Sequence, residues 1–210
     1  MPLPPSSGLR VQSNMRQNIL KQRLTALLLP LLVTVEPAMA HTAAGSVDGF
    51  AAGVFHPLQG ADHLLTMLAV GLWAAALGGR ALWLAPLSFV SLMAVGAVIQ
   101  LQGFAWPQVE WMVSTSVLAM GLTLWCDWRA SPGMAAVLVG IFAVSHGYAH
   151  AAEIGNGSDA IAYAGGFLMA TAGLHVLGIL TGVAGRQSRL VSRAFGLVCA
   201  SAGVVLLSGI

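Results

Sequence analysis

Long apolar segments with almost no charged side chains dominate this sequence. Only 8% of its 210 residues are Asp, Glu, Lys or Arg, and 57% are hydrophobic, whereas soluble domains carry about 25% charged residues. So few charges cannot make a water-facing surface, so most of the outer surface must face lipid. The sequence therefore predicts an all-α integral membrane protein. Nucleic-acid binding is excluded, because a net charge of +2 provides no basic patch or stripe.

The first 40 residues have the layout of a secretory signal peptide. Arg and Lys residues precede a short apolar run, and the Ala-Met-Ala triplet at 38–40 is typical of a cleavage site. The run is shorter than the ~20 residues that span a bilayer, and it contains Pro30. These features favour a cleaved signal peptide over a retained anchor. Cleavage leaves residues 41–210 as the membrane domain, with His41 as its N-terminus.

The rest of the chain contains six apolar segments that we interpret as transmembrane helices. Several are close to the lower limit of ~17 residues for a span. A further segment, 46–60, is interrupted by glycine and proline and is too short to cross, so we expect it to be re-entrant or interfacial. The predicted spans are 62–78, 81–101, 109–126, 133–150, 160–184 and 194–210.

The distribution of arginine predicts the orientation of these spans. Cytoplasmic loops are enriched in Lys and Arg, and a cleaved signal peptide places the mature N-terminus outside. The loops after the first, third and fifth spans then lie inside, and the opposite side carries acidic residues instead. We therefore expect a multi-pass protein of a bacterial inner membrane with a periplasmic N-terminus. The inner loops hold every cation of residues 41–210, namely Arg80, Arg129, Arg186, Arg189 and Arg193.

Three ionisable residues flank a chain break at the outer entrance of the first span. His56 precedes Pro57 and Gly60, and Asp62 and His63 follow them. A turn at this break can bring the three side chains together. Taken singly, Asp62 is a helix N-cap and the histidines are interfacial side chains. Together they favour a functional site, because ionisable groups in a membrane are costly and mark pathways.

A second polar group lies at the outer end of the fourth span. His146, His150 and Glu153 are spaced by four and three residues, which places them on one helical stripe. Histidines one turn apart have Cβ atoms about 5–6 Å apart, within chelating reach. The pattern favours a divalent metal ion, with a proton relay or an interhelical hydrogen-bond network as alternatives.

The predicted topology brings both motifs to the same face of the membrane, where they form one candidate site. Imidazole and carboxylate ligands without thiolate suit Ni²⁺, Co²⁺, Zn²⁺ or Fe²⁺ and disfavour Cu⁺. His41 would add an α-amine and an imidazole at the entrance, or be a mobile end. His175 lies deep in the fifth span, either as a further stop for the ion or as a histidine satisfied by a neighbouring helix. We interpret Glu110 as a helix-start acid.

These motifs resemble those of the HupE/UreJ family of membrane metal transporters. The first family motif, His-x5-Asp-His, is present at 56–63 and is followed by a matching run at 64–75 and by Gly-Arg-Ala-Leu-Trp at 79–83. The second is Phe-His-Gly-x-Ala-His-Gly-x-Glu. This chain departs from that motif at Ser145 and Ala151. It matches the motif at His146, Gly147, Ala149, His150 and Glu153.

The resemblance covers essentially the whole mature chain and implies uptake of nickel, or of cobalt as suggested for some members. Family members occur with hydrogenase or urease genes, so maturation proteins of those enzymes are expected partners. We expect no catalysed step and no resident cofactor, since the metal ion is the transported substrate. One alternative is a membrane-embedded accessory protein that hands nickel to an assembly system without transport. Another is a haem-binding electron carrier that uses paired histidines.

Overall fold

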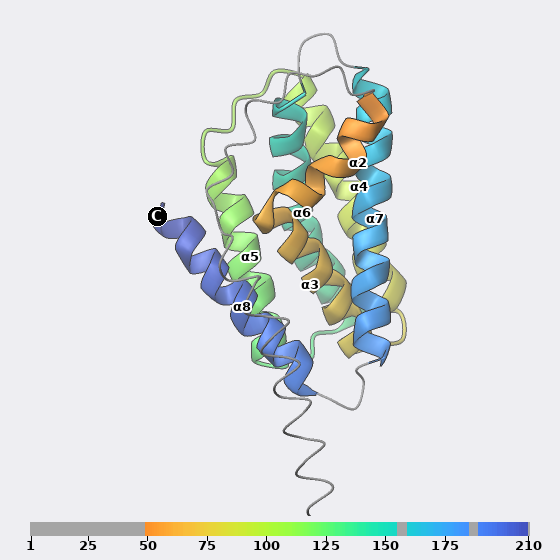
Figure 1. Ribbon diagram of the computed structural model, residues 1–210, viewed down its shortest axis with the longest axis vertical. Coiled ribbons are helices and arrows are strands. Elements are labelled where there is room, and N and C mark those ends of the chain that lie inside the picture. The colour runs from red at the N-terminus through yellow and green to blue at the C-terminus, as the bar shows by residue number, and fades with distance from the viewer. Residues whose placement is uncertain (1–48, 155–158, 185–188, 210) are drawn as a thin grey trace, which may run out of the picture. The chain divides into compact units, whose positions relative to one another are not determined.

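The computed structural model describes residues 49–154, 159–184 and 189–209 (Figure 1). The predicted signal peptide, His41 and Arg186 lie outside these residues. All regular secondary structure in the described residues is helical, which confirms the all-α prediction. The helices are α2 (Gly49–Gln59), α3 (Ala61–Leu77), α4 (Ala81–Leu101), α5 (Val109–Trp125), α6 (Pro132–Ala152), α7 (Ala160–Ala184) and α8 (Arg189–Ser208).

Four of the described helices, α4, α6, α7 and α8, are long and apolar enough to cross a membrane. Helices α2 and α3 meet this criterion only as a pair bent by 82°, which makes them a broken span or a re-entrant loop. Helix α5 is apolar but has 17 residues, the lower limit of about 17 for a span. By length and composition, the described residues therefore hold four spans, or five if α2 and α3 together form one. Helix α5 is a shorter apolar helix outside this count, and the number of six spans stays a prediction.

Most helix ends lie within one or two residues of the predicted ones, and α4 and α7 coincide with 81–101 and 160–184. Helix α8 differs, because it begins at Arg189 rather than at 194. Placing Arg189 and Arg193 in a loop was wrong. Arginine can keep its aliphatic stem on an apolar helix while its charge reaches the membrane surface, so the two cations do not end the helix.

Local residue chemistry sets two of the turns. Ser131 caps α6 by accepting a hydrogen bond from the Met134 backbone N–H at 3.3 Å, and Pro132 follows at the first helical position, where its missing N–H costs nothing. Helix α3 ends at Gly78 and Gly79, whose φ angles are 70° and 53°. Glycine adopts this left-handed region without the penalty of a Cβ.

The bend between α2 and α3 positions the first motif. Pro57 lies inside α2, where it cannot donate the helical hydrogen bond, and Gly60 has an extended backbone with φ −92° and ψ 119°. Helix α3 then begins at Ala61. His56 and His63 therefore lie on different helices that meet at a sharp angle.

Helix α3 contacts every other described helix, and nearly all its side chains from His63 to Ala75 are buried. The largest fully buried side chains include Met67 and Trp73 of α3 itself and Phe89 of α4. In Figure 1, α3 accordingly lies between α5 and α7. In the same view α3 starts where α2 ends and runs to the end of the described helices at which α8 begins (Figure 1).

Glycines allow the closest helix approaches. A Cβ on Gly147 of α6 would collide with the backbone carbonyl of Met93 in α4, and one on Gly71 of α3 would collide with that of His175 in α7. Small residues at such crossings let helices pack in lipid, where hydrophobic burial no longer drives association. The close packing brings residues from α3, α4, α6 and α7 into one interior.

The described arginines gather at the C-terminal end of α3, away from the histidine motifs. The Trp73 indole N–H donates to the carbonyl of Trp128 at 3.0 Å, and the Arg129 guanidinium donates to the carbonyl of Ala76. Arg80 directly precedes α4, just beyond the end of α3. The described chain therefore separates its cations from the first motif, which lies at the N-terminal end of α3.

Candidate metal site

Three imidazoles from three helices converge at the N-terminal end of α3. His56 of α2, His63 of α3 and His150 of α6 each offer a ligand atom, and these atoms all lie within 4.8 Å of one another. The ring centroids of His63 and His150 are 3.9 Å apart, and those of His56 and His150 are 4.8 Å apart. The bend at Gly60 and the packing of α3 against α6 thus unite the two sequence motifs. We call these three residues the histidine cluster.

Two carboxylates border the histidine cluster. Glu153 Oε2 lies 2.7 Å from His56 Nε2 and 3.9 Å from His150 Nδ1. Asp62 Oδ1 lies 3.5 Å from His63 Nδ1 and accepts a hydrogen bond from the His63 backbone N–H at 2.9 Å. Carboxylates in these positions orient imidazoles and make them better metal ligands. The cluster and its borders therefore contain five of the eight residues that the sequence singled out.

His146 lies behind the cluster rather than in it. Its side chain is fully buried, with Nδ1 at 3.1 Å from His63 Nδ1 and Nε2 at 2.8 Å from Ser116 Oγ. Ser116 Oγ also lies 3.3 Å from Thr66 Oγ1. Neither Thr66 nor Ser116 belongs to the two sequence motifs, and neither was predicted to contact them. The available signal was the presence of Thr and Ser inside otherwise apolar helices.

His175 lies apart from the cluster, in the middle of α7. It is 1% exposed, and its ring meets that of Phe89 edge to face with centroids 5.0 Å apart. Neither of its ring nitrogens, nor the hydroxyl of Thr171 one turn earlier, has a hydrogen-bond partner among the described residues. The partner on a neighbouring helix that would satisfy His175 is thus absent from the described part of the chain.

The remaining candidates divide between the described and undescribed residues. Glu110 lies in the first turn of α5, as expected for a helix-start acid, and it is close enough to Asp62 and Glu153 to interact with them electrostatically. His41 lies outside the described residues. Three described carboxylates, those of Asp62, Glu110 and Glu153, therefore interact with one another beside the histidine cluster.

The donor set fits a transition-metal ion. His150 is 3% exposed, and neither of its ring nitrogens has a hydrogen-bond partner among the residues described. A buried polar group without a partner costs roughly 1–3 kcal/mol. Neutral imidazole nitrogens are good ligands for Ni²⁺, Co²⁺ and Zn²⁺, so an ion bound by His150 and its neighbours would offset this cost.

Comparisons with known proteins agree with the resemblance seen in the motifs. A family model described as HupE / UreJ protein matches residues 29–206. Protein HupE of Rhizobium leguminosarum bv. viciae is 43% identical over 178 residues, which cover 82% of this chain and 92% of that protein. No solved structure matches the chain. The family match extends over most of the sequence and includes both histidine motifs, and the chain belongs to the HupE/UreJ family.

Proposed function

We propose that this chain is a permease for a divalent transition-metal ion, nickel or cobalt, in a bacterial inner membrane. The observation that carries the proposal is the convergence of His56, His63 and His150 from three helices. Imidazoles on separate helices seldom meet in an apolar protein unless a ligand or a network uses them, because burying them is costly.

The size of the cluster suits one ion. Nitrogen ligands at about 2.0–2.1 Å from a first-row metal such as zinc lie at most about 4.2 Å from one another. The three ligand atoms here lie within 4.8 Å of one another, so side-chain rotations that close the cluster slightly are enough to coordinate an ion. Glu153, at 2.7 Å from His56, is placed to complete the ligand set or to hold His56 in position.

Charge supports an inward direction of transport. Asp62, Glu110 and Glu153 give the entrance a negative field, which raises the local concentration of cations. The described arginines lie at the other end of α3, and cytoplasmic ends of membrane proteins are rich in arginine. We therefore place the histidine cluster at the periplasmic face of a six-span protein whose signal peptide is cleaved, with His41 near the entrance.

The membrane potential supplies the driving force in this proposal. Inward movement of a divalent cation down an inside-negative potential is favourable by about 4–5 kcal/mol per 100 mV. The ion would pass from the cluster to His146 and then to His175, which meets α3 further along its length, at Gly71. The ring nitrogens of His175 have no hydrogen-bond partner among the described residues. No covalent chemistry or nucleotide hydrolysis is needed. The ion delivered inside would supply hydrogenase or urease maturation proteins.

Transport and binding are separated by reconstituting the full chain in liposomes that contain a nickel-sensitive dye. We expect wild-type protein to carry Ni²⁺ inward with an inside-negative potential, and His150→Ala to lower the initial rate at least about tenfold. Ile141→Ala is the matched control, since Ile141 lies on the same helix and is exposed. Nickel binding without flux in wild-type protein would instead favour the accessory protein that hands over metal without transport.

A further inference from the structure

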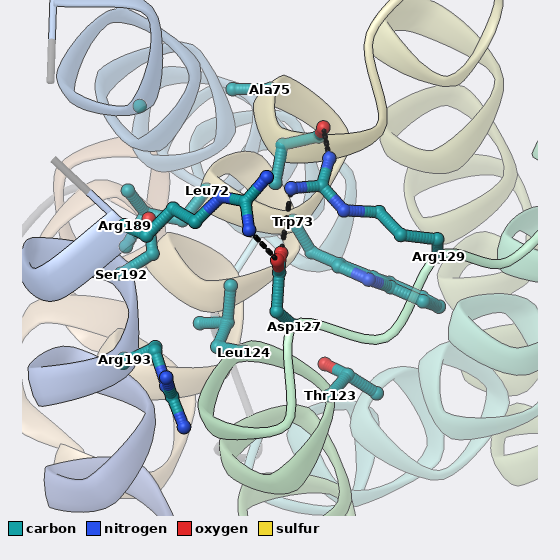
Figure 2. Close-up of a pocket in the computed structure, with 12 residues that line it drawn as sticks. Leu72, Trp73, Ala75, Thr123, Leu124, Asp127, Arg129, Arg189, Ser192 and Arg193 are labelled. Carbon is teal, nitrogen blue, oxygen red and sulfur yellow. Dashed lines mark hydrogen bonds and ion pairs between the residues drawn. The ribbon is translucent and has the colours of Figure 1, made fainter. Parts of the chain in front are cut away.

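A cavity of about 310 Å³ opens at the end of α3 opposite the histidine cluster. Residues of α3, α5, α7 and α8 line it, together with the segment between α5 and α6 (Figure 2). Leu72 and Trp73 form part of its wall, and Asp127, Arg129, Arg189 and Arg193 bring charge to it. We call this cavity the arginine pocket.

The arginine pocket has more positive than negative charge. Among the described residues, three guanidinium groups and one carboxylate line it, which leaves a formal surplus of two positive charges. Asp127 Oδ1 lies 2.7 Å from Arg129 Nη2, and its Oδ2 lies 3.7 Å from Arg189 Nη1, as the dashed lines of Figure 2 show. One carboxylate thus serves two arginines and neutralises one charge. This surplus repels divalent cations, so the pocket is not a second metal site.

The third arginine, Arg193, uses only its Nε in the hydrogen bond that the structure shows. Arg193 Nε donates to the carbonyl of Trp125 at 3.0 Å, an interaction that leaves the positive charge uncompensated. Helix α8 begins at Arg189, and the N–H groups of its first turn add positive partial charge at the same end. The arginine side chains are also accessible, since those of Arg129 and Arg189 are 51% and 79% exposed.

We propose that the arginine pocket binds a phosphate group, carried by an anionic phospholipid or free in solution. Guanidinium groups present paired N–H donors that match phosphate oxygens, and such bonds are stronger than those between neutral groups. A cavity of this size can take a phosphate with its glycerol, and basic pockets between membrane helices bind lipid headgroups. The proposal concerns the opposite end of α3 from the histidine cluster and does not depend on the metal ion.

Asp127 makes the proposal testable in two directions. Its φ of 51° is in the left-handed region that few residues other than glycine adopt, although Asp and Asn tolerate it. Asp127 competes with an incoming phosphate for Arg129 and Arg189. Asn in its place keeps the shape and the backbone tolerance but removes the negative charge. Asp127→Asn should therefore strengthen phosphate binding, whereas loss of an arginine should weaken it.

The experiment uses the purified full chain in detergent and native mass spectrometry. The probes are phosphatidylglycerol, phosphatidylcholine and inorganic phosphate. We expect phosphatidylglycerol to bind in preference to phosphatidylcholine, and Arg189→Gln with Arg193→Gln to lower its affinity at least about tenfold. Arg80→Gln is the matched control, because Arg80 lies at the same end of α3 but does not line the pocket.

The outcomes separate the two sources of phosphate. Competition between inorganic phosphate and phosphatidylglycerol would show that the phosphate group itself is recognised. Binding of the lipid alone would assign the pocket to a headgroup, and binding of inorganic phosphate alone would assign it to a free anion. The proposal fails if neither phosphatidylglycerol nor inorganic phosphate binds. It also fails if Arg80→Gln weakens binding as much as the pocket variants do.

Two further variants guard against misfolding. Arg189→Lys with Arg193→Lys keeps both charges but not the paired donors, so we expect binding between that of wild-type protein and the glutamine variant. Asp127→Asn should bind phosphatidylglycerol more tightly than wild-type protein, a gain that a damaged fold cannot produce. Weaker binding by a folded Asp127→Asn variant would overturn the proposal.

Discussion

The imidazole rings of His63 and His150 meet edge to face with their centroids 3.9 Å apart, although they belong to α3 and α6. Ring contact alone does not satisfy either polar group. Both nitrogens of His150 are buried and have no hydrogen-bond partner among the described residues, which costs free energy in an apolar environment. A metal ion that accepts lone pairs from both residues offsets this cost, and this pair is therefore central to the proposed permease.

Glu153→Gln should weaken nickel binding while preserving the fold. Glutamine keeps the length of the side chain and a hydrogen bond to His56, but it removes the charge 2.7 Å from His56 Nε2. Loss of such an outer ligand costs about 10–100-fold in metal affinity. Competition with a nickel chelator measures the change. Asp159→Asn is the control, because Asp159 caps the start of α7 and Asn keeps that cap; equal effects of the two variants would contradict a specific role for Glu153.

Gly147→Ala should destabilise the protein through helix packing. The new Cβ would collide with the carbonyl of Met93, and such overpacking costs about 1–3 kcal/mol. We expect a lower melting temperature and weaker nickel binding, because α6 carries His150 into the cluster. Gly133→Ala on the same helix has nothing within 4 Å of its Cβ and should leave both unchanged. Equal melting temperatures for the two variants would refute the close packing of α4 and α6.

Ser116→Ala should destabilise the protein, because His146 loses a hydrogen-bond partner. The change removes the oxygen 2.8 Å from His146 Nε2 and leaves a buried nitrogen without its partner, at a cost of about 1–3 kcal/mol. Thermal unfolding monitored by tryptophan fluorescence measures the effect. Ser145→Ala is matched in burial but loses only a bond to the Phe142 carbonyl of its own helix, so it should cost less. The reverse order would show that Ser116 does not hold His146.

His175→Leu should slow nickel transport without lowering the stability of the protein. Leucine removes a buried imidazole that has no hydrogen-bond partner among the described residues, and replacing an unsatisfied polar group by an apolar one is neutral or stabilising. We expect an unchanged or higher melting temperature and unchanged nickel affinity at the cluster, together with slower flux in liposomes. Flux at the wild-type rate would remove His175 from the proposed route.

Apolar length and helical spacing predicted much of this architecture. They placed α4 and α7 at their observed ends, and the spacing of His146, His150 and Glu153 put these residues on one helix near the first motif. Spacing within a helix cannot show which neighbour a side chain meets. It therefore could not separate His146, which bonds Ser116, from the three converging histidines, and it could not find Ser116 or Thr66.

The sequence patterns also did not predict where α8 begins or that the arginine pocket exists. Charge was taken to end a membrane helix, yet Arg189 and Arg193 lie within α8 because their long side chains carry the charge outward. Only the packing of α3, α5 and α8 reveals that Asp127 pairs with both Arg129 and Arg189. The sequence indicated where the cations lie along the chain but not that they share a cavity.

X-ray absorption spectroscopy of the nickel-loaded full chain tests the central claim most directly. We predict imidazole scattering that requires three histidine ligands, from His56, His63 and His150, with oxygen ligands completing the shell. His150→Ala should lose one imidazole, and Ile141→Ala should lose none. Nickel bound without imidazole ligands, or a spectrum that His150→Ala leaves unchanged, would contradict the proposed metal site.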